Sequence, residues 1–323
     1  MLTTRQLLLC LIPLPFLLAL CLLAGSSGFG LPDLNTPTGR ALLDLRLCRL
    51  VTGFVVGAAL ACSGCALQAV LRNALAEPYV LGVSCGGSLG AALVIATGLS
   101  ALTPLALPAG AFIAAAATLL LVCLLANRAS GYTPNTLILT GVVAGSMLSS
   151  LLMLLLSFAK TRAVHSITWW LLGNLQATSW PLIAGVALLV LVSVGALCYE
   201  ARTLNALLLG HEAAHNLGVR TRWAVPCILT AATLAAAAAV SVSGIIGFVG
   251  LIVPHALRRL TGANHRTLLP CSALFGGAFL VLCDTLARTL AAPHEIPVGV
   301  ITSLSGGPFF LYLLTRKGRL PLT

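Results

Sequence analysis

Charged residues are scarce in this sequence: only 8% of its 323 residues are Asp, Glu, Lys or Arg, and only seven are acidic. A soluble chain of this length needs far more polar surface to cover its core. Hydrophobic residues make up 59% of the chain, and its mean hydropathy is +1.05. These values exclude a soluble globular protein and predict an all-α integral membrane protein, with residues 1–323 in a single transmembrane domain.

The sequence also lacks the string G-x-x-x-x-G-K-[ST], which holds the phosphates of ATP. We therefore expect no ATPase site of this kind, no enzyme activity, no cofactor and no resident metal ion. The net charge of +11 fits basic cytosolic loops of a membrane protein, so nucleic acid is not an expected partner. Most of the eleven cysteines lie inside apolar runs, where we expect small core residues rather than disulfides.

Long apolar stretches fill the rest of the chain, and a spanning helix needs roughly 20 such residues. They predict about ten transmembrane helices, at residues 7–29, 47–70, 79–98, 104–126, 135–158, 180–200, 223–243, 246–258, 268–291 and 297–315. Twelve basic residues then fall inside and six outside, which predicts cytosolic N- and C-termini. Trp169, Trp170 and Trp180 predict an interfacial belt around a short surface helix, with membrane lipid as a partner.

The longest polar interruption runs from Tyr199 to Trp223, on the predicted cytosolic side. His211, Glu212 and His215 within it fit H-E-x-x-H, the pattern of a zinc hydrolase. A catalytic zinc needs a third protein ligand, and the remaining candidates lie in or across the membrane. An ion-coupled secondary transporter is a second alternative, but it needs an ionisable residue deep in the membrane, and every predicted helix centre is uncharged.

Two strings stand out from the apolar background because Gly, Pro and a lone carboxylate are poor choices for a lipid-facing helix. They are S-G-C-A-L-Q-A-V-L-R-N-A-L-A-E-P-Y-V-L-G-V-S at 63–84 and G-I-I-G-F-V-G-L-I-V-P-H at 244–255. Together they resemble the permease subunits of ATP-driven ABC importers for iron-siderophore, haem and cobalamin. The resemblance continues through H-R-T-L-L-P at 265–270 and I-P-V-G-V-I-T at 296–302, and covers most of the chain from Leu45 onward.

This resemblance implies a type II ABC importer permease fold in the bacterial inner membrane. It implies a homodimer with the pathway between the two copies, an ABC ATPase subunit beneath each copy and a periplasmic substrate-binding protein above. A ferric siderophore is the first expected substrate, with cobalamin and haem as alternatives. The residues themselves do not distinguish between these three substrates.

The same resemblance assigns roles within the polar interruption. L-G-x-E-x-A-x-x-L-G resembles the helix through which such permeases dock into their ATPase, in a coupling segment at about 203–222. The residues implied are Gly210, Glu212, Ala214, Leu217 and Gly218. Gly218 is expected to end a first short helix and let the chain turn into a second.

The resemblance also implies a cytosolic gate where the second helix meets the third. The family string R-N-P-L-A-E-P places Asn73 and Leu75 in that gate, although this chain has Ala74 where proline is common. Thr133 and Asn135 would lie opposite. A plain helix connection is the alternative for the first pair, and helix capping explains the second pair equally well.

On the outer side, L-R-L-C-R and C-D-T-L-A-R resemble strings whose arginines receive acidic residues of the binding protein. The residues implied are Arg46, Arg49 and Arg288, with Cys48 replacing a family proline. Such a patch would attract acidic partners in a salt-dependent way. The alternative is that these arginines reach lipid headgroups and that Arg288 neutralises Asp284, four residues away.

Overall fold

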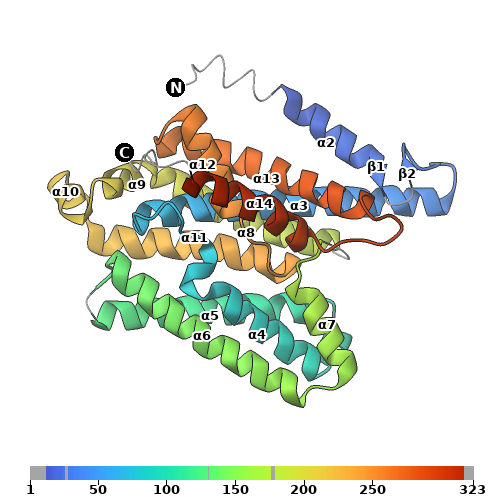
Figure 1. The fold of residues 1–323 in the computed structure, drawn as a ribbon, viewed down its shortest axis with the longest axis horizontal. Coiled ribbons are helices and arrows are strands. Elements are labelled where there is room, and N and C mark those ends of the chain that lie inside the picture. Colours follow the sequence, from blue (N-terminus) through green and yellow to red (C-terminus); the bar gives the residue numbers. More distant parts are fainter. Residues whose placement is uncertain (1–11, 26–27, 130, 176–178, 316–323) are drawn as a thin grey trace.

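The computed structural model describes residues 12–25, 28–129, 131–175 and 179–315. This part of the chain is helical almost throughout, and most of its helices run along the long axis of the molecule (Figure 1). The first described helix, α2 (Pro13–Leu23), leads into a two-stranded antiparallel hairpin of β1 (Ala24–Gly25) and β2 (Gly28–Phe29). In this hairpin Ala24 pairs with Phe29.

The remaining helices follow in chain order. They are α3 (Pro37–Val70), the 3-10 helix η1 (Pro78–Leu81), α4 (Val83–Ala96), the 3-10 helix η2 (Leu99–Ala101), α5 (Ala106–Ala129), α6 (Pro134–Phe158), α7 (Thr161–Leu171), α8 (Trp180–Tyr199), α9 (Ala201–Leu208), α10 (His211–Asn216), α11 (Thr221–Ser243), α12 (Val249–Thr261), α13 (His265–Thr289) and α14 (Val298–Thr315).

The core of the bundle consists of α3, α11 and α13. The apolar windows of these helices are 78%, 72% and 61% buried, whereas those of α5, α6 and α8 are only 33%, 28% and 22% buried. Helices that expose most of an apolar surface need a nonaqueous surrounding, so the outer three face lipid or another membrane-embedded chain.

The core helices approach closely because glycines meet at their contact. A Cβ on Gly57 of α3 would overlap the carbonyl oxygen of Gly276 in α13, and a Cβ on Gly276 would press on Ala61. Small residues at such crossings let two helix backbones touch, which is a common way to pack helices in membranes.

Each of the ten predicted helices corresponds to a helix of the structure. Six described helices are long and apolar enough to cross a membrane, and α2, α4 and α14 are shorter apolar helices. The predicted surface helix with its two tryptophans is α7. Residues 7–11 of the first predicted helix and both chain ends, on which the predicted placement of the termini depends, lie outside the described residues.

Three predicted boundaries are wrong. The first helix stops at Leu23 rather than at residue 29, because the hairpin follows directly. The second helix begins at Pro37, ten residues early, since Thr36 caps it by accepting a hydrogen bond from the Gly39 N–H at 3.1 Å. The third begins as η1 and becomes an α-helix only at Val83, after Gly82 at a φ of 77°.

Two stretches of the chain are irregular: residues 71–77 precede η1 and α4, and residues 244–248 precede α12. Each lies within one of the two strings that set this sequence apart. The second stretch lies against η1, which follows the first: the Tyr79 hydroxyl donates to the Ile246 carbonyl at 2.8 Å and accepts from the Ile246 N–H at 3.1 Å. Broken backbone inside a membrane protein requires such internal partners for its polar groups.

Candidate coupling, gate and docking sites

The predicted functional residues lie toward opposite ends of the long axis. Helices α9 and α10 lie at one end of the molecule, and the hairpin and α7 lie at the other (Figure 1). Of the predicted gate residues, Asn73 and Leu75 lie in the irregular stretch between α3 and η1, and Thr133 and Asn135 lie at the start of α6. The irregular stretch borders the coupling segment, because a Cβ on Gly210 would lie 3.5 Å from the Arg72 guanidinium. The docking residues therefore form a separate site.

Helix α10 is a short exposed element that carries two of the five predicted coupling residues, Glu212 and Ala214, and the other three flank it directly. Glu212 lies in its first turn, where the helix dipole favours a carboxylate. Ala214 is fully buried and fixes the helix to the body of the protein. Leu209 and Leu217, just before and just after α10, are each 64% exposed. A short exposed helix that carries one carboxylate and is flanked by two exposed leucines is a surface suited to binding another protein.

Glycines separate α10 from its neighbours. Gly210 has a φ of 112° and lies between α9 and α10, and Gly218 has a φ of 86° and follows α10. Gly218 was predicted to end the first of two short helices, but it ends the second, because α9 precedes α10 and the long helix α11 follows. The positive φ explains why glycine is needed at this helix end.

The zinc alternative gains no support from the described residues, in which no group of three His, Cys, Asp or Glu side chains lies where it could hold a metal ion. His211 is the first residue of α10, and His215, on the same helix, is exposed.

The predicted gate residues Asn73 and Leu75 form a tight turn. The Asn73 side-chain oxygen accepts from the Leu75 N–H at 2.9 Å, and the Asn73 carbonyl accepts from the Ala76 N–H at 3.0 Å. Leu75 is 40% exposed at the tip of this turn. Asparagine stabilises such turns by this local hydrogen bond, so Asn73 holds Leu75 in its exposed position without the family proline at residue 74.

The second predicted gate pair lies at the start of α6. Thr133 is the N-cap of this helix, and its hydroxyl accepts from the Thr136 N–H at 3.3 Å, as the capping alternative predicted. Asn135 is exposed on the first turn. The close contact between α6 and the gate region is two turns further on, where a Cβ on Gly141 would overlap the Val80 carbonyl oxygen.

One residue of the gate region that the sequence did not identify is Glu77. Its carboxylate accepts a hydrogen bond from the Phe248 N–H at 2.9 Å, across 171 residues of sequence. Burial raises the pKa of the Glu77 carboxyl, and the Phe248 N–H opposes that rise. The sequence shows Glu77 as a lone carboxylate in an apolar string, but it does not indicate that Phe248 is its partner.

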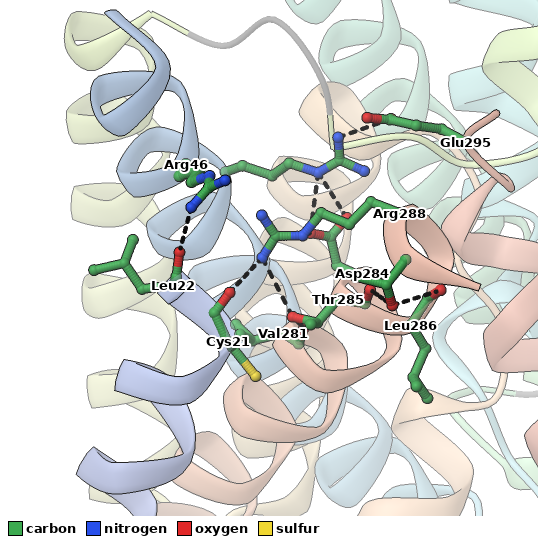
Figure 2. A network of polar contacts seen from close by, with 11 residues as sticks. Cys21, Leu22, Arg46, Val281, Asp284, Thr285, Leu286, Arg288 and Glu295 are labelled. Atoms are coloured by element: carbon green, nitrogen blue, oxygen red, sulfur yellow. Dashed lines mark hydrogen bonds and ion pairs between the residues drawn. The ribbon is translucent and has the colours of Figure 1, made fainter. Parts of the chain in front are cut away.

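On the outer side, Arg49 and Arg288 flank the buried carboxylate of Asp284, and Arg46 lies nearby against the end of α2 (Figure 2). Arg49 Nε donates to both oxygens of Asp284 at 2.8 and 3.0 Å, and Arg49 Nη1 donates to Glu295 at 2.9 Å. Arg288 Nε lies 3.5 Å from the second Asp284 oxygen. Asp284 therefore pairs more closely with Arg49, 235 residues away, than with Arg288 four residues away.

Arg46 and Arg288 also complete the C-terminus of α2. Arg288 Nη2 donates to the Cys21 carbonyl at 2.7 Å, and Arg46 Nη1 lies 3.4 and 3.3 Å from the carbonyls of Leu22 and Leu23. The Ala24 N–H donates to the remaining carbonyl, that of Leu20. The last four carbonyls of a helix have no partner within it, and here every one has a donor.

These contacts change the predicted docking patch. Arg46 is 6% exposed and Arg288 is 3% exposed, and both point toward backbone carbonyls rather than toward solvent. Arg49 keeps 13% of its side chain accessible beside Glu295, which is 24% accessible. A partner approaching this end of the molecule would therefore meet Arg49 and Glu295 before the other two arginines.

Comparison with known proteins finds a matching family and similar permeases. The model of the FecCD transport family matches residues 12–316. The cobalamin import system permease protein BtuC of Halobacterium salinarum is 42% identical over 291 residues, covering 90% of this chain and 76% of that protein. The hemin transport system permease protein HmuU of Yersinia pestis is 39% identical over 314 residues, covering 93% and 94%.

A solved structure has the same fold over nearly the whole length. It is an inward-facing conformation of a metal-chelate type ABC transporter, with a TM-score of 0.83 and 32% sequence identity. The match covers 95% of this chain and 99% of the other. The predicted type II ABC importer permease fold is thereby confirmed.

Proposed function

Because the chain belongs to the FecCD transport family of ABC importer permeases, we propose that it moves a metal chelate from a periplasmic binding protein to the cytosol, across the bacterial inner membrane. The observation that carries this proposal is α10, a short exposed helix with one carboxylate in its first turn, between two exposed leucines. The chain itself has no string that binds ATP phosphates, so an ATPase subunit must supply the energy.

The ATPase docks against α10 on the cytosolic side, with Glu212 and Leu217 in the contact and Ala214, Gly210 and Gly218 shaping the helix. Movement of the ATPase on binding ATP is passed to α10 and from there to the gate at Asn73 and Leu75, with Thr133 and Asn135 on the facing helix. Both chain termini lie on the same, cytosolic side.

The binding protein docks at the opposite end, near the hairpin. Of the three predicted docking arginines, Arg49 is the most accessible, and Arg46 and Arg288 act by holding α2 and the hairpin in place. Two copies of the chain form the pathway between them, because α5, α6 and α8 expose apolar surface that a second copy and lipid can cover.

Within the class of metal chelates, a ferric siderophore is our first candidate, because the strings of this sequence resemble the family that imports such compounds. Cobalamin and haem are the alternatives, since the similar proteins named above carry those substrates in their names.

Uptake by whole cells tests the proposal. Cells with and without this chain, each supplied with the ATPase and binding-protein partners, are given labelled ferric siderophore, haem or cobalamin. We expect accumulation of one of the three to require the chain. Cells that contain the chain but lack the ATPase are the control, and they should accumulate none. Equal uptake with and without the chain for all three would contradict the proposal.

Co-purification of the ATPase tests the role of α10. Leu217→Asp places a charge in the proposed contact, and we expect the affinity for the ATPase to fall by about tenfold, which corresponds to about 1.4 kcal/mol. Glu212→Ala should act in the same direction. Leu102→Asp is the matched control, because Leu102 is 78% exposed and follows η2, away from α10. Unchanged binding by Leu217→Asp would exclude α10 as the contact.

A further inference from the structure

We propose that Glu77 is a positioning residue that ties the gate loop, defined as residues 71–77, to the N-terminus of α12. Through this contact the two irregular stretches move as one unit when the gate opens or closes. The contact is a feature of the fold, whereas its consequence for transport depends on the proposed function.

Helix α12 lacks an N-terminal cap of its own. Its N-cap residue is Phe248, which makes no side-chain capping hydrogen bond and has a φ of 69°, an unusual value for a residue with a side chain. Glu77 supplies an acceptor from another part of the chain, since its carboxylate accepts from the Phe248 N–H at 2.9 Å. A negative charge at a helix N-terminus is also favoured by the helix dipole.

The contacts on both sides of Glu77 place it in a defined position. Tyr79 exchanges two hydrogen bonds with Ile246, before Phe248 in the chain. Gln68 donates to the Gly250 carbonyl at 3.0 Å, after Phe248, and a Cβ on Gly64 would overlap that same carbonyl. Glu77 thus lies in the middle of a joint whose backbones are in direct contact, and it contributes the acceptor for the Phe248 N–H.

The same joint continues to α14 through Phe248. A Cβ on Gly306 of α14 would overlap the Phe248 side chain, so the ring of Phe248 lies against this glycine. About two turns further along α12, His255 and Phe309 contact edge to face with ring centroids 6.5 Å apart. The position of Phe248, which Glu77 fixes, therefore also fixes where α14 packs.

The proposed ATPase contact reaches this joint through one continuous helix. Gly218 ends α10, α11 begins at Thr221, and its C-terminus at Ser243 leads directly into residues 244–248. Because α11 is buried along most of its length, it is packed tightly against its neighbours and can transmit a displacement along its axis. A displacement of α10 therefore moves Phe248, and the hydrogen bond between Phe248 and Glu77 moves the gate loop with it.

This arrangement predicts a particular defect when the carboxylate is removed. Without Glu77, the ATPase can still dock and hydrolyse ATP, because α10 and α11 are intact. The gate loop is no longer held to α12, so hydrolysis and gate movement are uncoupled. The number of chelate molecules moved per ATP falls, while the rate of ATP hydrolysis is retained.

The test compares Glu77→Ala with Glu77→Gln in the complete transporter, reconstituted with its ATPase and binding protein. Glu77→Gln keeps an oxygen that accepts from the Phe248 N–H, and Glu77→Ala removes it. We expect the ratio of chelate to ATP to fall by roughly fivefold or more in Glu77→Ala, the lower end of common coupling strengths, and to stay close to that of the unaltered protein in Glu77→Gln. Hydrogen exchange at the Phe248 amide should become faster only in Glu77→Ala.

An unchanged ratio in Glu77→Ala, or an equally large loss in Glu77→Gln, would overturn the proposal. If Glu77→Ala does not fold, Tyr79→Phe removes a neighbouring contact of the same joint; an unchanged ratio there would count equally against it. Failure of the proposed function gives a different result. In that case the unaltered transporter moves none of the three chelates, while the exchange rate at Phe248 still distinguishes the two Glu77 variants.

Discussion

The arginines of the outer end show how single residues can serve helices far from their own. A buried guanidinium needs several acceptors, and a helix C-terminus has four carbonyls without partners. At the end of α2, Arg46 and Arg288 donate to these carbonyls. Arg49 donates to the carboxylates of Asp284 and Glu295. The three charges are thereby satisfied by groups within the chain, which is the condition for burying them.

Removal of Arg288 tests this role against direct docking. Arg288→Ala leaves Asp284 with one partner fewer and the Cys21 carbonyl without a donor, and breaking a buried pair costs about 3 to 5 kcal/mol. We expect a clearly lower Tm in detergent. Arg162→Ala, at an exposed position on α7, is the control and should leave the Tm unchanged. A normal Tm together with weakened capture of the binding protein would instead support docking by Arg288 itself.

At the level of elements, the apolar stretches were enough to predict the ten helices, and the tryptophans indicated the short helix α7. Hydropathy reports where a helix can lie in a membrane, and six of the ten are long and apolar enough to cross one. The start of α3 could not be predicted in this way, because Pro37, Thr38, Gly39 and Arg40 are not apolar. The break before α4 was indicated by Pro78 and Gly82, but its length depends on contacts with 244–248.

The partners in the candidate sites could not be predicted, because they are far apart in sequence. Arg49 and Asp284 are separated by 235 residues, and Glu77 and Phe248 by 171. The sequence favoured Asp284 with Arg288 because four residues is one helical turn. In the structure the guanidinium of Arg49 reaches Asp284 more closely, since α3 and α13 touch at Gly57 and Gly276.

That crossing of α3 and α13 gives a prediction for the two helices. Gly57→Ala introduces a Cβ that overlaps the Gly276 backbone, so the helices must separate and we expect a lower yield and a lower Tm. Gly195→Ala is the matched control, because this glycine lies within α8 with open space around its Cα. There alanine should be neutral or stabilising by up to about 1 kcal/mol. Equal behaviour of the two variants would show that the glycine contact does not limit packing.

For the whole molecule, single helices connect the sites. Helix α3 has 34 residues, about 51 Å at 1.5 Å per residue, and runs from the outer arginine network to the gate loop. Helix α11 runs from α10 to the other side of the same joint. The outer arginine network and helix α10 are therefore both connected, through α3 and α11, to the contact between the gate loop and residues 244–248.

The number of copies in the working assembly is a prediction at this scale. The low burial of α5, α6 and α8 within one chain leaves apolar surface for a second copy, so the purified transporter should contain two permeases and two ATPases. Native mass spectrometry of the detergent-solubilised complex measures this directly, with the ATPase purified alone as the reference. A complex with one permease would exclude a pathway between two copies.

The dependence of α2 on Arg288 has a consequence for how the protein is made. Cys21 and Arg288 are 267 residues apart, and ribosomes add about 5 to 20 residues per second. The first helix therefore enters the membrane on the order of 10 to 50 s before the side chain that completes its C-terminus has been synthesised. During that interval its carbonyls need other donors, such as water, lipid headgroups or the insertion machinery. A nascent chain that stalls before α13 would be left with an incompletely anchored first helix, which quality-control proteases can recognise.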